Sequence, residues 1–197
     1  MGRTSDARER LIQSGMELLH SGGYARAGVR EICARAGVQK GSFYHFFATK
    51  GDLGLAVLER YHSHAHAVLD QALTPELSPA ARIERLFQLS SEIQQQFRQE
   101  VGVMPGCPFG NLVLEMSTCD EGFRLFLARV LREIMERLEG AIRTAEPESD
   151  GQQTKHRAEA IFALLEGAIL IAKAENDPSI IQRMGIMAKR LVSTRDA

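Results

Sequence analysis

The sequence predicts an all-α protein, and two observations support this fold class. Apolar residues recur every three or four positions in most segments, which is the spacing of one helix face. No segment shows sustained alternation of apolar and polar residues with β-branched enrichment, which would indicate a strand. The first helix is expected over residues 5–21 and ends at Gly22–Gly23. Its apolar stripe consists of Leu11, Ile12, Gly15, Leu18 and Leu19.

Two short helices, over residues 28–36 and 39–46, are separated by Gly37. Thr49 and Asp52 then indicate the start of a fourth helix, since Ser or Thr followed three residues later by an acid is typical of a helix N-terminus. This fourth helix is expected over residues 49–73. Further helices are expected over residues 79–101, 108–116, 120–144, 154–175 and 178–193, and a polar loop over 146–153.

Charge is distributed unevenly along the 197 residues. The whole chain has a formal net charge of −1. Residues 1–50 hold eight basic and four acidic residues, whereas the remainder holds 16 basic and 21 acidic residues. A basic segment over residues 1–50, followed by an acidic remainder, indicates an anionic partner for the first segment alone. The polar start MGRTSDARERL is unlike a secretory signal, and no apolar run is long enough for a membrane span, so we expect a soluble, cytoplasmic protein.

Residues 28–46 have the dimensions of a helix-turn-helix. Because a helix of two turns is unstable alone, Phe43 and Phe47 are expected to anchor the second helix to its neighbours. The opposite face then carries groups that suit a phosphate backbone, and Gly41 allows close backbone approach. Those groups are the side chains of Lys40, Ser42, Tyr44 and His45, with Lys50 as a further cation at the start of the fourth helix.

The segment GVREICARAGVQKGSFYHFFATKGDL resembles the DNA-binding signature of TetR-type transcriptional repressors, and the resemblance covers residues 10–58. It implies an N-terminal three-helix helix-turn-helix DNA-binding domain over residues 1–50 and a C-terminal helical ligand-binding and dimerisation domain over 51–197. It also implies a homodimer on a palindromic double-stranded DNA operator, released by a small-molecule inducer. Gly28 stands where the family often has a capping Thr. Because glycine has no side chain, only its backbone N–H is expected to contact the phosphate. Gln39 replaces the usual Ser or Thr and is expected to read a base edge.

The two C-terminal helices, over residues 154–175 and 178–193, are the candidate dimer interface. Their apolar faces would form a four-helix bundle across a two-fold axis. The alternative is that both helices pack only within their own chain. The candidate interface residues are Ala163, Gly167, Ile171, Ile180, Met184 and Met187.

The loop PGCPFG, within residues 105–110, carries a candidate reactive thiol. Pro108 suits the first position of a helix, which makes Cys107 its N-cap. The helix dipole is then expected to favour the thiolate, and the flanking Pro and Gly residues to hold the loop open. The run GCPFGNLVLEMS also resembles a subgroup of TetR-type repressors that includes sensors of electrophiles and oxidants. The alternative is that Cys107 is an unreactive, structural cysteine.

Two other residues could act together with Cys107. Cys119 is either a resolving thiol or a helix cap, and Lys173 could meet a thiol and lower its pKa. Cys33 lies on an apolar helix face and is expected in the core. No CxxC pair is present, which argues against a zinc site or a disulfide framework.

His62 and His66 are one helical turn apart, but two ligands make an incomplete metal site. The sequence therefore predicts a solvated helix face, with no metal and no cofactor. No Ser/His/Asp constellation, glycine-rich phosphate loop or carboxylate pair indicates an enzyme. The leading hypothesis is a DNA-binding repressor released by an inducer or by modification of Cys107. The alternative is a helical small-molecule-binding or adaptor protein that does not bind an operator.

Overall fold

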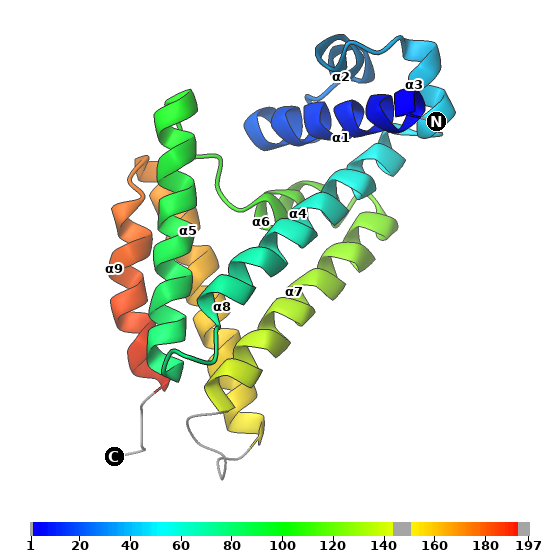
Figure 1. Cartoon of the computed structure of the whole chain (residues 1–197). Coiled ribbons are helices and arrows are strands. Elements are labelled where there is room, and N and C mark those ends of the chain that lie inside the picture. Colours follow the sequence, from blue (N-terminus) through cyan, green and yellow to red (C-terminus); the bar gives the residue numbers. More distant parts are fainter. Residues whose placement is uncertain (1, 144–150, 193–197) are drawn as a thin grey trace. The chain divides into compact units, whose positions relative to one another are not determined.

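The computed structural model describes residues 2–143 and 151–192 (Figure 1). Throughout these ranges the regular structure is helical, which confirms the all-α prediction. The helices are α1 (Gly2–Gly22), α2 (Val29–Ala36), α3 (Lys40–Phe46), α4 (Lys50–Ala72), α5 (Pro79–Val101), α6 (Pro108–Met116), α7 (Glu121–Arg143), α8 (Gly151–Glu175), α9 (Ser179–Ala188) and a final 3₁₀ helix (Lys189–Val192).

Helix boundaries follow local capping chemistry. Thr49 and Asp52 form the predicted capping box: the Asp52 N–H donates to Thr49 Oγ1 at 3.1 Å, and the Thr49 N–H donates to the Asp52 carboxylate at 2.8 Å. Ser78 caps α5, ahead of Pro79. The helix predicted from residue 154 begins three residues earlier, so residues 151–153 of the expected 146–153 loop are helical. Residues 144–150 and 193 of these predictions lie outside the described ranges.

The chain divides into two compact units. One comprises Met1–Ser63 with Asn111–Leu127, and the other comprises His64–Gly110 with Ala128–Ala197. The first unit contains α1 to α3, and the second contains α5, α8 and α9. The boundary predicted from the sequence, at residue 50, stays a prediction.

The first unit is built around the short helices α2 and α3. Phe43 is fully buried, and its ring centroid lies 5.7 Å from that of Phe47, which is also buried. Arg10 donates to the carbonyl of Ala36 at 2.9 Å and so ties α1 to the end of α2. Gly37 ends α2 in the left-handed conformation, which turns the chain toward α3. The anchoring role predicted for Phe43 and Phe47 is therefore confirmed.

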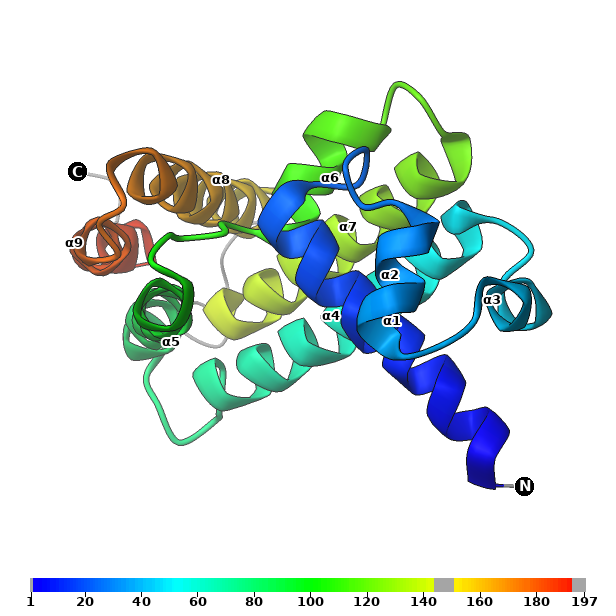
Figure 2. The same cartoon turned by 90° about the horizontal axis from the view of Figure 1, so that it is seen from above.

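The second unit places α9 against both α5 and α8 (Figures 1 and 2). Ile161, Ile181 and Phe87 are almost completely inaccessible to solvent and supply part of its core. Among the helices that the structure describes, none is both long enough and apolar enough to cross a membrane.

Candidate functional site

The face of α3 opposite Phe43 is open to solvent. Lys40, Ser42, Tyr44 and His45 are all exposed, and 52% of Tyr44 is accessible even though it is aromatic. Tyr44 packs edge-on against Phe43, with ring centroids 5.2 Å apart, so the core holds its ring in place. The residues predicted to contact DNA on α3 therefore share one exposed surface, and their contact with DNA stays a prediction.

The residues just before α2 and α3 lie where the sequence predicted. Gly28 is the N-cap of α2 in an extended conformation and makes no side-chain capping bond. Gln39 is the N-cap of α3, and its side chain makes no capping hydrogen bond either. A side-chain amide that does not serve the helix end is available to a base edge. Gly41 is exposed, with no atom within 4 Å of the position a Cβ would take.

Lys50 has a partner that the sequence did not indicate. Its Nζ donates to the Tyr24 carbonyl at 2.6 Å and lies 4.2 Å from the centroid of the Tyr24 ring. Burial lowers the pKa of the Lys50 ammonium from its usual value, and the charge of Glu115 acts in the opposite direction. Lys50 therefore faces the loop between α1 and α2, and its contact with phosphate stays a prediction.

Cys107 lies directly before α6, and its position as N-cap is confirmed. The Gly110 N–H, in the third position of the helix, donates to Cys107 Sγ at 3.4 Å. The expectation of an open loop is wrong, because Pro105 and Gly106 are buried. Gln94 of α5 holds the backbone of Gly106 through two reciprocal hydrogen bonds of 3.1 Å.

The expected stabilisation of the Cys107 thiolate is also wrong. Burial, followed by the negative charge of Glu166, raises the pKa of the Cys107 thiol well above its usual value. The N–H groups of Gly110 and Phe109 act in the opposite direction, as the helix N-terminus should, but they do not outweigh burial and charge. The helix end is therefore present, and its effect on the thiol is overcome by burial and by a neighbouring carboxylate.

Glu166 is a residue of this site that sequence reasoning missed. It lies on α8, hydrogen-bonds with the Cys107 side chain, and has its pKa raised by burial. Glu166 also lies close to Gly110: a Cβ there would lie 2.7 Å from Glu166 Oε2, so only glycine fits there without displacing the carboxylate. Lys173, the predicted neighbour, is exposed and lies about two turns further along α8.

The two other cysteines lie in different environments. Cys33 is buried, as predicted, and burial raises the pKa of its thiol. Cys119 is exposed. It does not cap α7, because the Phe123 N–H donates instead to the Asp120 carboxylate at 3.0 Å. A role for Cys119 as a resolving thiol stays a prediction.

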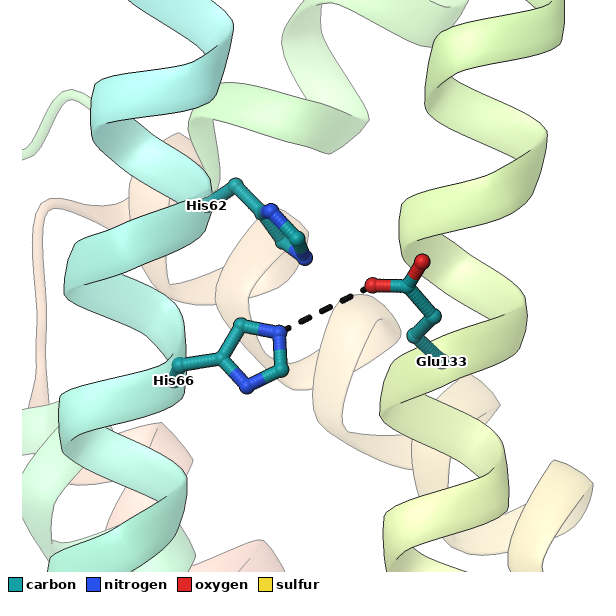
Figure 3. A group of neighbouring side chains, drawn as sticks. All are labelled: His62, His66 and Glu133. Atoms are coloured by element: carbon teal, nitrogen blue, oxygen red, sulfur yellow. Dashed lines mark ion pairs between the residues drawn. The ribbon is translucent and has the colours of Figure 1, made fainter.

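His66 is less solvated than the sequence indicated. Its Nε2 lies 3.7 Å from a carboxylate oxygen of Glu133 on α7 (Figure 3). Arg137 Nη1 lies 3.2 Å from the Nδ1 of His66. No sequence signal pointed to Glu133, because α4 and α7 are far apart along the chain. His62 lies on the preceding turn of α4, and the prediction that this segment holds no metal stays a prediction.

The candidate dimer residues lie on two helices that pack together within the chain. Part of each helix is buried there, including Ala168 and Ile181. The other part is exposed: 53% of Ile171 and 47% of Met187 are accessible, and Ala163 is also exposed. Apart from the backbone of its own helix turn, no atom lies within 4 Å of the position that a Cβ on Gly167 would take. One face of these helices therefore packs inside the chain and another is open, and the dimer interface stays a prediction.

Comparison with known proteins agrees with this arrangement. The model of the family described as "Bacterial regulatory proteins, tetR family" matches residues 11–57. A second model, described as "Transcriptional regulator LmrA/YxaF-like, C-terminal domain", matches residues 79–186. The transcriptional regulator AcuR of Cereibacter sphaeroides is 39% identical over 176 residues, which cover 87% of this chain and 78% of AcuR. The repressor NemR of Escherichia coli K12 is 27% identical over 96% of this chain and 95% of its own length.

Solved structures give the same result. A regulatory protein TetR from Rhodobacter sphaeroides is 35% identical, with a TM-score of 0.80 over 94% of this chain and 98% of that one. The reduced form of E. coli NemR is 28% identical, with a TM-score of 0.80 over 94% and 97% of the two chains. The matched regions include both the helix-turn-helix and the C-terminal helices. The relatives described above are named as transcriptional regulators rather than enzymes. The chain therefore belongs to the TetR family of bacterial regulatory proteins.

Proposed function

We propose that this protein is a repressor that binds a palindromic operator as a homodimer, and that modification of Cys107 releases it. The observation that carries the operator role is the exposed polar face of α3. Phe43 is fully buried and fixes the helix, while Lys40, Tyr44 and their neighbours face solvent. A rigid helix that presents a cation, hydroxyls and an imidazole suits the phosphates and base edges of a major groove.

The Lys40→Ala variant tests this role. Because each lost phosphate contact removes a released counterion, the slope of log affinity against log salt should flatten by about 0.9 per contact, or about 1.8 for a dimer. The Tyr44→Ala variant should weaken binding to all DNA sequences similarly. Affinity for the DNA upstream of the protein's own gene, measured in a salt series by fluorescence anisotropy, gives both quantities.

Lys155→Ala is the matched control, because Lys155 is exposed on α8 and carries the same charge. It should keep the wild-type slope. Binding that is independent of salt, or a Lys40→Ala slope equal to that of the wild type, would contradict operator binding through α3. The helical adaptor hypothesis would then be favoured.

The homodimer is supported by the exposed faces of α8 and α9. Leu170 and Ile171 are 61% and 53% accessible on α8, and Ile186 and Met187 are 45% and 47% accessible on α9. Large apolar side chains gathered on two adjacent helices are typical of a protein interface. A two-fold axis through this face would bring two helices from each protomer together, with Gly167 allowing close approach.

The release step is supported by the environment of Cys107. Its sulfur accepts a hydrogen bond from the first turn of α6, so an adduct on the sulfur would remove a cap and add bulk beside Glu166. The relative NemR is known in a reduced form, which supports a redox or electrophile response at this thiol. Because the resting thiol is held neutral, attack requires loss of its proton first. Cys107 therefore gives a regulator that stays on DNA until a reactive inducer accumulates.

A further inference from the structure

Glu115, near the end of α6, holds the loop between α1 and α2. Its two carboxylate oxygens accept hydrogen bonds from consecutive backbone N–H groups, at 2.8 Å from Tyr24 and 2.6 Å from Ala25. Bonds from backbone N–H groups to an ionised carboxylate are among the stronger hydrogen bonds in proteins. α6 and this loop lie next to each other in Figure 2. A single side chain thus fixes the chain where it enters the helix-turn-helix.

Gly23 makes room for this contact. It has a φ of 82°, in the region that favours glycine, and a Cβ there would lie 3.1 Å from Glu115 Oε2. Any other residue would strain the turn and press on the carboxylate. The loop backbone is therefore shaped to receive Glu115.

The peptide between Tyr24 and Ala25 is held at both ends. Its N–H donates to Glu115, and its carbonyl accepts from Lys50, the first residue of α4. The Tyr24 ring also packs edge-on against Phe123 of α7, with centroids 5.1 Å apart. A carboxylate from α6 and an ammonium from α4 thus meet on one peptide group of the DNA-binding unit.

α6 carries the proposed sensor at its other end. Cys107 caps its first turn, and Glu115 lies seven positions after Pro108, at an axial distance of about 10 Å at 1.5 Å per residue. Because α6 is one continuous helix from Pro108 to Met116, we expect a shift of its capped end to reach the carboxylate near its last turn. Glu115 is the point where that shift would reach the backbone before α2.

We propose that Glu115 is the positioning residue through which α6 controls the helix-turn-helix, by holding or releasing the Tyr24–Ala25 backbone. This inference rests on the proposed function of Cys107, and it assigns the regulatory contact to the loop before α2. In the resting protein the two hydrogen bonds from Tyr24 and Ala25 to Glu115 (the clamp) keep the loop, and with it Lys50, in place. Modification of Cys107 displaces α6, opens the clamp and loosens the unit that presents α3.

The test compares Glu115→Gln with the control Glu121→Gln in a Cys119→Ser background. Glu121 is an exposed acid at the start of α7, and Cys119 is removed because it is the exposed thiol. Each protein is measured before and after reaction with N-ethylmaleimide. Two quantities are recorded: amide hydrogen exchange at Tyr24 and Ala25, and operator affinity.

In the Cys119→Ser parent protein, alkylation should speed hydrogen exchange of the Tyr24 and Ala25 amides about tenfold or more, as expected for loss of charge-assisted hydrogen bonds. In Glu115→Gln the two amides should exchange fast even before alkylation. The operator affinity of this variant should change much less on alkylation than that of the parent. Glu121→Gln should behave as the parent does.

Two outcomes would overturn the proposal. In one, Glu115→Gln is less stable but retains the parent's full response to alkylation, which is a purely structural role. In the other, exchange at Tyr24 and Ala25 is unchanged by alkylation. If alkylation leaves the parent bound to DNA, the proposed function fails, and the exchange rates of the two amides still decide whether α6 controls the clamp.

Discussion

Replacing Ile171 with glutamate is expected to make the protein monomeric and to lower operator affinity by about a hundredfold to ten-thousandfold. Ile171 is an apolar residue, 53% exposed, on the proposed dimer face of α8. A carboxylate there would have to be buried without a partner in the dimer, which is costly. The loss of affinity follows because two linked half-site contacts bind far more tightly than one.

Sedimentation and operator titration on the same samples measure both effects. Val101→Glu is the matched control, since Val101 is a 62% exposed apolar residue at the end of α5 and undergoes the same chemical change. It should remain a dimer and bind as the wild type does. A monomeric Ile171→Glu protein that retained full affinity for a palindrome would rule out the proposed assembly, as would an unchanged dimer.

Replacing Glu166 with glutamine is expected to speed alkylation of Cys107 at neutral pH by about tenfold or more. The carboxylate of Glu166 is one of the two main causes of the raised pKa of the Cys107 thiol. Without that charge the folded-state pKa moves down, so more thiolate is present at a given pH, and thiolate is the reacting species. Each unit by which the pKa falls gives about a tenfold larger thiolate fraction below that pKa.

The rate of N-ethylmaleimide addition, followed by mass spectrometry in the Cys119→Ser background, gives the full pH profile. The profile of Glu166→Gln should have its midpoint at lower pH than the parent. Glu175→Gln, an exposed acid at the end of the same helix, should leave the midpoint where it is. A midpoint that rose in Glu166→Gln would mean that Glu166 assists deprotonation of the thiol. An unchanged midpoint would mean that the charge of Glu166 does not contribute to the raised pKa.

The helices and the exposed face of α3 could be predicted from the sequence because the forces behind them act between close neighbours. The Thr49–Asp52 capping box and the Cys107 cap before Pro108 each involve residues three positions apart. The alternation of buried Phe43 with exposed Tyr44 follows directly from helical geometry. In each case the local pattern contains the whole interaction.

The electrostatic partners could not be predicted in this way. Cys107 meets Glu166 only because α8 packs against the loop before α6, and burial there outweighs the helix end that the sequence did reveal. Glu115 accepts a hydrogen bond from a backbone N–H 91 residues earlier in the chain. Because nearly every residue carries such an N–H, the residue type at that position does not indicate the contact. Lys50 was expected at phosphate because it starts a helix, yet its hydrogen-bond partner is a carbonyl 26 residues away.

Operator release on alkylation of Cys107 tests most directly whether this regulator is switched by its thiol. In the Cys119→Ser background, a single adduct on Cys107 should free the DNA in an anisotropy titration. The Cys107→Ser, Cys119→Ser double variant should bind the same DNA and stay bound after identical treatment. If both proteins keep the DNA, or both release it equally, Cys107 is a structural cysteine and a thiol switch is contradicted.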